Sequence, residues 1–137
     1  MALKCGIIDF QNKDDYLPTS FGELITTYSQ EMPFPELENA SIAIIGVEED
    51  RNAVSNKGCS LAPDYIRNKL YQLYQGSFKV NVVDLGNIKK GDTVEDTYFA
   101  LSTSIAELIK SDIVPVVLGG SLDLTYPVYC AYEKLSK

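Results

Sequence analysis

Carboxylates follow three apolar segments that the sequence predicts to be strands. Glu48, Glu49 and Asp50 come after the first segment, Asp84 lies near the end of the second, and Asp123 follows the third. Because the carboxyl ends of parallel strands share one edge of a sheet, these oxygens could together bind a hard divalent cation. No Asp-x-Asp spacing supports a metal cage, so the alternative is that they are helix N-caps and solvated loop acids. Asp123 in particular would suit an N-cap.

The third segment leads into a glycine turn. Ile113–Leu118 is apolar and predicts a strand buried on both faces, and the paired Gly119 and Gly120 end it. Two glycines allow a positive φ angle and a close backbone approach, at the edge where open α/β sheets bind ligands. The candidate site turn is therefore Gly119, Gly120, Ser121 and Asp123. Its backbone N–H groups could hold an anion, but it matches neither the GxGxxG nor the Walker pattern.

The sequence contains no histidine. Ser-His and Cys-His pairs and imidazole metal ligands are therefore excluded. The three cysteines, Cys5, Cys59 and Cys130, form neither a disulfide framework nor a CxxC motif and are expected to be reduced thiols. On these grounds the sequence assigns no catalytic and no cofactor-binding residue.

The composition is that of a soluble globular domain. The 137 residues are 45% hydrophobic and 23% charged, and no apolar run approaches the roughly 20 residues that span a bilayer. The start of the chain does not read as a secretory signal, so a cytoplasmic location is expected. The net charge is −7 and the basic residues are scattered, which argues against a nucleic-acid partner.

Strand and helix patterns alternate along most of the chain. Such βαβ alternation predicts an α/β fold in which helices cover a parallel sheet of three strands. A loop at Arg51–Leu61 is longer than a simple connection requires. The expected elements are strands at Ser41–Val47, Lys79–Leu85 and Ile113–Leu118, and helices at Ala62–Gly76, Asp92–Ile109 and Tyr126–Leu135.

Five finer patterns complete the prediction. Ser20 and Glu23 fit a capping box for a short helix reaching Met32, and Asp92 to Glu95 resembles another. Each of the next two predicted helices has an apolar stripe expected to face inward. The stripes are Ile66, Leu70, Leu73 and Tyr74 in one helix, and Val94, Tyr98, Leu101, Ile105, Leu108 and Ile109 in the other. In the last helix Tyr126, Tyr129 and Tyr132 indicate either core packing or a subunit interface.

Taken together, several short motifs resemble the amino-terminal third of the arginase, agmatinase and formimidoylglutamase (ureohydrolase) family. They occur in the family's order between about residues 37 and 135. The motifs are Ile42–Val47, Glu49–Arg51, Asn56–Gly58, Ala62-Pro63, Ile66-Arg67, Asp84–Gly86 and Val114–Asp123.

The resemblance implies a partial three-layer α/β/α fold with a parallel sheet. In that family a site with two manganese ions carries a bridging hydroxide that attacks a guanidinium or formimino carbon. Its first metal ligand is the histidine of a Gly-Gly-x-His turn, and here that position is Leu122. Leucine has no lone pair to donate. The remaining ligands belong to an Asp-x-His-x-Asp motif and a later aspartate pair, which this sequence does not contain.

The resemblance therefore implies an amino-terminal domain or fragment of an arginase- or formimidoylglutamase-like protein. It is expected to lack a working dimanganese site because of Leu122, and so to be inactive as given. One alternative is a non-catalytic binding or assembly module with the arginase-like fold. Another is a hydrolase completed by further segments of a longer chain.

The resemblance also divides the chain. Residues 1–36 are expected to form an amino-terminal extension with a short helix, and residues 37–137 the amino-terminal part of the arginase-like domain. No cofactor is expected for this chain, although the family uses Mn²⁺. The expected partners are a second copy in a homo-oligomer or the remainder of a longer chain, and neither nucleic acid nor a membrane.

Overall fold

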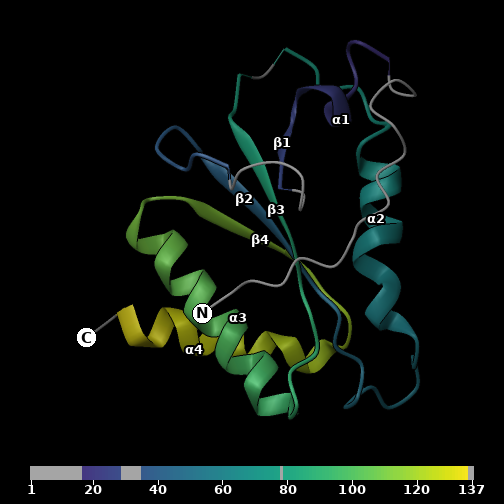
Figure 1. Cartoon of the computed structure of the whole chain (residues 1–137), viewed down its shortest axis with the longest axis vertical. Helices are drawn as coiled ribbons and strands as arrows, with labels where there is room; N and C mark the ends of the chain where they lie inside the picture. Colours follow the sequence, from purple (N-terminus) through teal and green to yellow (C-terminus); the bar gives the residue numbers. More distant parts are fainter. Residues whose placement is uncertain (1–16, 29–34, 78, 136–137) are drawn as a thin grey trace.

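The computed structural model describes residues 17–28, 35–77 and 79–135, and these build a four-stranded parallel sheet with helices on both faces (Figure 1). The strand order is β1-β3-β2-β4, so β3 and β2 are the inner strands. The strands are β1 (Thr26–Thr27), β2 (Ile42–Val47), β3 (Val82–Ile88) and β4 (Val114–Leu118). This arrangement confirms the predicted α/β fold with a parallel, helix-covered sheet.

Helices alternate with these strands. The α-helices are α1 (Phe21–Leu24), α2 (Ala62–Leu70), α3 (Val94–Lys110) and α4 (Thr125–Leu135), and two 3-10 turns are η2 (Cys59–Leu61) and η3 (Leu122–Leu124). The right-hand side of Figure 1 shows α2 on one side of the sheet, while α3 and α4 lie on the other. No helix in the described part of the chain is long and apolar enough to cross a membrane.

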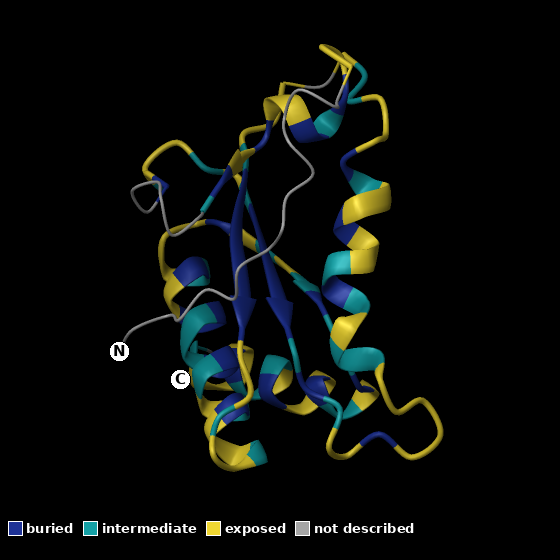
Figure 2. Cartoon of the chain, turned by 45° about the vertical axis from the view of Figure 1, so that its right-hand side comes forward, coloured by how far each residue is buried: buried dark blue, intermediate teal, exposed yellow. Residues whose placement is uncertain are grey.

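The larger core lies between the sheet and the α3–α4 layer. It joins alternate residues of the inner strands, such as Ala43 and Ile45, to the apolar face of α3. The predicted stripe of α3 is confirmed: Leu101, Ile105 and Leu108 are buried, and the rest of the stripe is partly covered. The central strands are coloured as buried along most of their length in Figure 2.

The capping box of α3 is displaced by one residue from its predicted position. Thr93 is the N-cap, and its hydroxyl accepts a hydrogen bond from the Asp96 backbone N–H. The Asp96 carboxylate in turn accepts from the Thr93 N–H. The reciprocal pattern is the one predicted, but Thr93 and Asp96 form it in place of Asp92 and Glu95.

The helix predicted from Ser20 to Met32 is wrong beyond Leu24. α1 is a single turn, and the Ser20 side chain makes no capping hydrogen bond. Thr26 and Thr27 instead form β1, which pairs in parallel with β3 and adds a fourth strand to the predicted three. Their β-branched side chains favour an extended backbone. Residues 29–32 of the predicted helix lie outside the described residues.

The predicted inward stripe of α2 is also wrong. Ile66, Leu73 and Tyr74 are exposed, and only Leu70 of the predicted stripe is partly covered. The buried positions of α2 are Pro63 and Arg67. Arg67 faces the sheet because its guanidinium pairs with Asp84 of β3, so the hydrophobic pattern did not identify the inward face.

β4 is not buried on both faces as predicted. Along this strand exposed and half-buried residues alternate until Leu118, which is buried. On the α2 side of the sheet Leu118 packs with Ile44 and Tyr71. The cover on this face reaches only the Leu118 end of β4. Because β4 is also an edge strand, Val114 and Val116 at its other end remain exposed.

Candidate functional site

The glycine turn lies directly against the loop that follows β2. A Cβ atom added at Gly120 would overlap the carbonyl oxygen of Glu49, so no larger residue fits there without movement of the backbone. The same oxygen accepts hydrogen bonds from the backbone N–H of Ser121 at 3.0 Å and from its hydroxyl at 3.2 Å. The predicted close approach is confirmed. The predicted positive φ angle is wrong for both Gly119 and Gly120: among the described residues the glycines with positive φ are Gly58, Gly76 and Gly86.

Glu49 is the centre of the polar contacts at this edge. Its buried carboxylate accepts from the Arg51 guanidinium at 2.6 and 3.0 Å, from the Arg51 backbone N–H at 2.9 Å, and from the Thr97 hydroxyl at 3.0 Å. The hydrogen bonds from the Arg51 side chain are the main cause that lowers the pKa of Glu49 to about 2. Arg51 also donates to the carbonyl oxygens of Asp92 and Thr93, and so ties the loop to the start of α3.

Asp50 stabilises the Arg51–Leu61 loop. Its carboxylate accepts from the Gly58 backbone N–H at 2.9 Å and from the Ser60 hydroxyl at 3.0 Å, and it pairs with Lys90. The hydrogen bond from Lys90 is the largest contribution that lowers the pKa of Asp50 to about 2. This carboxylate holds the loop on the protein surface.

The Asp84 carboxylate is buried on the α2 side of the sheet. It accepts from Arg67 at 2.7 and 2.9 Å, from the Tyr71 hydroxyl at 2.7 Å and from the Gly86 backbone N–H at 2.9 Å. Asn87, beside it, accepts from Arg67 and donates to Glu48 at 2.9 Å. Asp84 and Glu48 therefore belong to the α2–β3 interface.

Asp123 accepts a hydrogen bond from the Tyr98 hydroxyl, and the Asn52 amide donates to the same hydroxyl at 3.1 Å. Asp123 is therefore not the predicted N-cap, since Ser121 occupies the N-cap position of η3. The pKa of Asp123 is lowered: the hydrogen bonds from Ser121 and Tyr98 outweigh desolvation, which is the largest single contribution and acts upward. Leu122, the residue before Asp123, is 87% exposed.

The strand-end carboxylates are thus gathered at neighbouring loops, but each has its own protein donors. Among the described residues no group of three or more His, Cys, Asp or Glu side chains is arranged to hold a metal ion. Sequence reasoning missed most of these donors, namely Asn52, Thr97 and Lys90, and the pairing role of Arg51. The one available signal was Arg51, which falls within a motif of the family resemblance. Cys59 and Cys130 are free thiols, and Cys5 lies outside the described residues.

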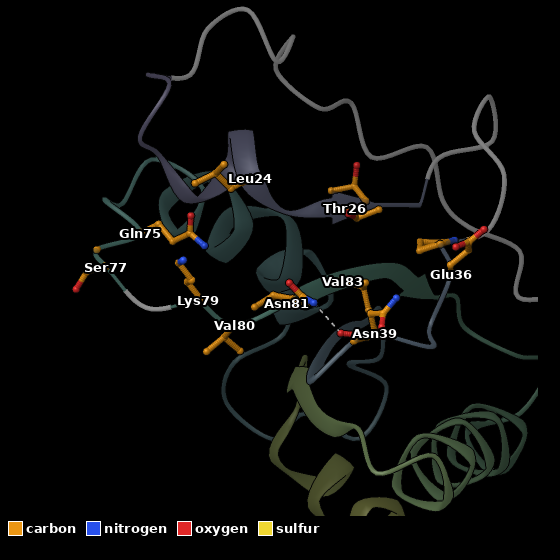
Figure 3. A pocket seen from close by; sticks show the side chains of 15 residues that line it. Leu24, Thr26, Glu36, Asn39, Gln75, Ser77, Lys79, Val80, Asn81 and Val83 are labelled. Atoms are coloured by element: carbon orange, nitrogen blue, oxygen red, sulfur yellow. Dashed lines mark hydrogen bonds between the residues drawn. The ribbon is translucent and has the colours of Figure 1, made fainter.

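A hollow of about 1070 Å³ lies at the other end of the sheet, where β2 and β3 begin (Figure 3). Thr26, Asn39, Asn81 and Val83 contribute to its lining, and the Asn81 amide donates to the Asn39 carbonyl oxygen at 2.9 Å. Its lining is mixed polar and apolar. No predicted site residue lies there.

The fold and the turn define a partial three-layer α/β protein whose polar loops meet at the carboxyl edge of a parallel sheet. The model of the Arginase family matches residues 40–137, and the chain belongs to that family.

Comparison with known proteins identifies relatives of several kinds. A formimidoylglutamase of Halobacterium salinarum is 28% identical over 130 residues, which are 85% of this chain and 41% of that protein. An uncharacterized 32.2 kDa protein of Methanothermus fervidus is 29% identical over 98 residues, which are 66% of this chain and 34% of that protein. The chain therefore spans about a third to two fifths of the length of these curated relatives.

Solved structures share the fold. Formimidoylglutamase from Bacillus subtilis superposes with a TM-score of 0.70 at 23% identity, over 86% of this chain and 38% of that one. A Trypanosoma cruzi formiminoglutamase with Mn²⁺ has a TM-score of 0.65 at 24% identity, over 72% of this chain and 38% of that one. These similarities support a partial arginase-like fold.

Proposed function

We propose that the chain is the amino-terminal portion of a formimidoylglutamase-like protein that keeps the arginase fold without the dimanganese chemistry. The observation that carries this proposal is Leu122. It occupies the position of the family's first histidine ligand, and its hydrocarbon side chain has no lone pair for a metal. It stands 87% exposed at the carboxyl edge, where a ligand would have to be.

The neighbouring side chains do not fit a manganese ion either. Hard cations need several oxygen or nitrogen ligands that can turn toward one point. Asp123 accepts from Tyr98, and both Glu49 carboxylate oxygens accept from the Arg51 guanidinium. A metal at Glu49 would have to displace these hydrogen bonds. The buried Oδ1 of Asp123 has no hydrogen-bond partner, but it is a single ligand, and the resulting site would still lack an imidazole. No hydrolytic step is therefore assigned to these residues.

A second candidate function is a non-catalytic binding or assembly module. It is favoured by the tyrosines of α4: Tyr126 is 63% exposed, Tyr129 is 60% exposed, and Tyr132 is also exposed. Large aromatic side chains gathered outside the core mark interaction surfaces more often than single exposed ones do. Loss of metal chemistry and use of the fold as a binding scaffold are compatible.

The experiment is a calorimetric titration of the chain with MnCl₂, combined with product assays on arginine, agmatine and formiminoglutamate. We expect neither saturable binding nor hydrolysis. Leu122→His should add at most weak binding, equal to that of Leu73→His, which places an exposed histidine just after the end of α2. Saturable binding with hydrolysis by the unmodified chain would overturn the proposal. Strong binding by Leu122→His alone would show that a single substitution caused the loss.

A further inference from the structure

The hollow at the amino end of the sheet is formed by three segments that are distant in the sequence. Leu24 and Thr26 come from α1 and β1, Glu36 and Asn39 precede β2, and residues 79–83 lead into β3 and begin it. Its volume of about 1070 Å³ is at the upper end of the range found for sites that hold drug-sized molecules. Because it lies at the opposite end of the strands from the glycine turn, it is separate from the site already described.

Several polar side chains of this hollow have no partner within the described part of the chain. Glu36 and Lys79 are exposed and form no ion pair there. The side chains of Thr26, Asn39 and Gln75 make no hydrogen bond to any described residue. The carboxylates that follow β2, in contrast, accept hydrogen bonds from protein donors. The polar groups of the hollow are therefore available to a ligand.

The two charged side chains lie at opposite ends of the hollow. Figure 3 shows Lys79 at one end and Glu36 at the other, with Asn81 and Val83 between them. Since an extended chain advances by at most about 3.5 Å per residue, the four steps from Lys79 to Val83 span at most roughly 14 Å. A ligand that meets both charges needs a cationic and an anionic end that are roughly 10 Å apart, which is more than a single amino acid provides.

The groups between these ends suit a peptide backbone. The Asn81 amide donates to the Asn39 carbonyl oxygen at 2.9 Å, and this hydrogen bond fixes the Asn81 side chain at the hollow. Side-chain amides both donate and accept hydrogen bonds, as the peptide group itself does. Leu24 and Val80 are 55% and 39% exposed and offer apolar contacts to a ligand side chain.

We propose that this hollow binds a tripeptide with free termini in an extended conformation. Its ammonium group pairs with Glu36 and its carboxylate with Lys79. Its backbone amides hydrogen-bond to the asparagine side chains, and its central side chain lies against the apolar part of the lining. An extended tripeptide is roughly 10 Å long, which matches the separation of the two charges. This inference does not depend on the proposed loss of metal chemistry, so the manganese experiment can fail without affecting it.

Calorimetric titration of the full chain with the peptide Ala-Leu-Ala tests the proposal. We expect one site with a dissociation constant on the order of 0.1 mM, the affinity expected for a ligand of this size. The N-acetylated and the C-amidated peptides each lack one terminal charge. Each should bind about three- to fivefold more weakly, which is the effect of losing one exposed ion pair.

Two variants assign the peptide termini to the two side chains. Glu36→Gln should weaken binding of the unmodified peptide by the same factor but leave the N-acetylated peptide unaffected, because that peptide has no ammonium group to lose a partner. Lys79→Met should weaken only the peptides that have a free carboxylate. Glu95→Gln and Lys69→Met remove exposed charges outside the hollow and should leave all three affinities unchanged.

Three results would overturn the proposal. The first is the absence of saturable binding of Ala-Leu-Ala at concentrations up to the order of 10 mM. The second is equal affinity for the free, acetylated and amidated peptides, which would show that the termini do not meet the two charges. This comparison needs no change in the protein, so it does not depend on how the variants fold. The third is equal weakening by the variants inside and outside the hollow, which would show a general effect of net charge.

Discussion

Replacing Arg67 with methionine tests whether a buried ion pair, and not an apolar stripe, fixes α2 to the sheet. Methionine keeps much of the length of the side chain but removes every donor. In the structure the Arg67 guanidinium donates to Asp84 at 2.7 and 2.9 Å and to the Gly86 carbonyl at 2.9 Å. Both partners of this pair are buried. The substitution therefore leaves the Asp84 charge inside the protein without its cation.

The expected cost follows from these contacts. Removing one partner of a buried pair destabilises a protein by about 3–5 kcal/mol. Asp84 keeps two other donors, the Tyr71 hydroxyl and the Gly86 N–H, which places the expected loss near the lower end, at about 3 kcal/mol. A domain of 137 residues has a free energy of unfolding of roughly 7–20 kcal/mol, so the variant should still fold.

Urea unfolding followed by circular dichroism measures the effect. Asp84→Asn added to Arg67→Met should recover about 1–2 kcal/mol relative to the sum of the single variants, because the uncompensated charge disappears. Lys110→Met, which breaks an exposed pair with Glu107, is the control and should cause no measurable change. A loss below about 1 kcal/mol for Arg67→Met, or strict additivity in the double variant, would refute this reasoning.

Three further predictions concern the carboxyl edge. Gly120→Ala should destabilise the protein by about 2 kcal/mol because its Cβ meets a backbone oxygen, whereas Gly119→Ala, whose Cβ meets only ordinary contacts, should be near neutral in the same urea assay. The pKa of Glu49 is lowered from 4.5 to about 2, so its carboxylate stabilises the fold fully above pH 4.5 and progressively less as the pH falls toward 2. The stability gap to Glu49→Gln should close over that range in acid titrations, and a constant gap would contradict the assignment. Thr93→Ala should reduce the free energy of unfolding by about 1 kcal/mol and so lower the melting temperature. An unchanged melting temperature would show that the capping box does not stabilise α3.

Periodic patterns predicted the elements that bury many apolar residues. α3 was predicted with its inward stripe because Leu101, Ile105 and Leu108 repeat at helical spacing over several turns. β1 was missed because two threonines are too few to show a strand period, and they become a strand only by pairing with β3. The inward face of α2 was wrong because the partner of Arg67 is Asp84, 17 residues further along the chain, which no local pattern reveals.

The candidate site could be located from the sequence but not described. The strand-end positions of Glu49, Asp50 and Asp123 followed from the alternation of elements. Their hydrogen-bond partners could not be predicted, because they come from a distant helix. Thr97 and Tyr98 of α3 are 48 residues from Glu49 and 25 residues from Asp123 in the sequence, respectively. The glycine turn illustrates the same limit: its sequence indicated both a positive φ angle and a close backbone approach, and the structure shows only the close approach, of Gly120 to the Glu49 carbonyl.

The contacts of these carboxylates also explain how the fold can persist under the proposed loss of metal chemistry. Several acids at one edge repel one another unless cations or hydrogen-bond donors compensate them. In this chain Arg51 compensates Glu49, Lys90 compensates Asp50, and the Tyr98 hydroxyl donates to Asp123. Glu49 and Asp50 are thus balanced by cations within the protein, whereas Asp123 has only hydrogen-bond donors and its buried Oδ1 has no hydrogen-bond partner. If the proposed loss of the ligand at position 122 holds, these hydrogen bonds and ion pairs are what keep the loops of the carboxyl edge in place.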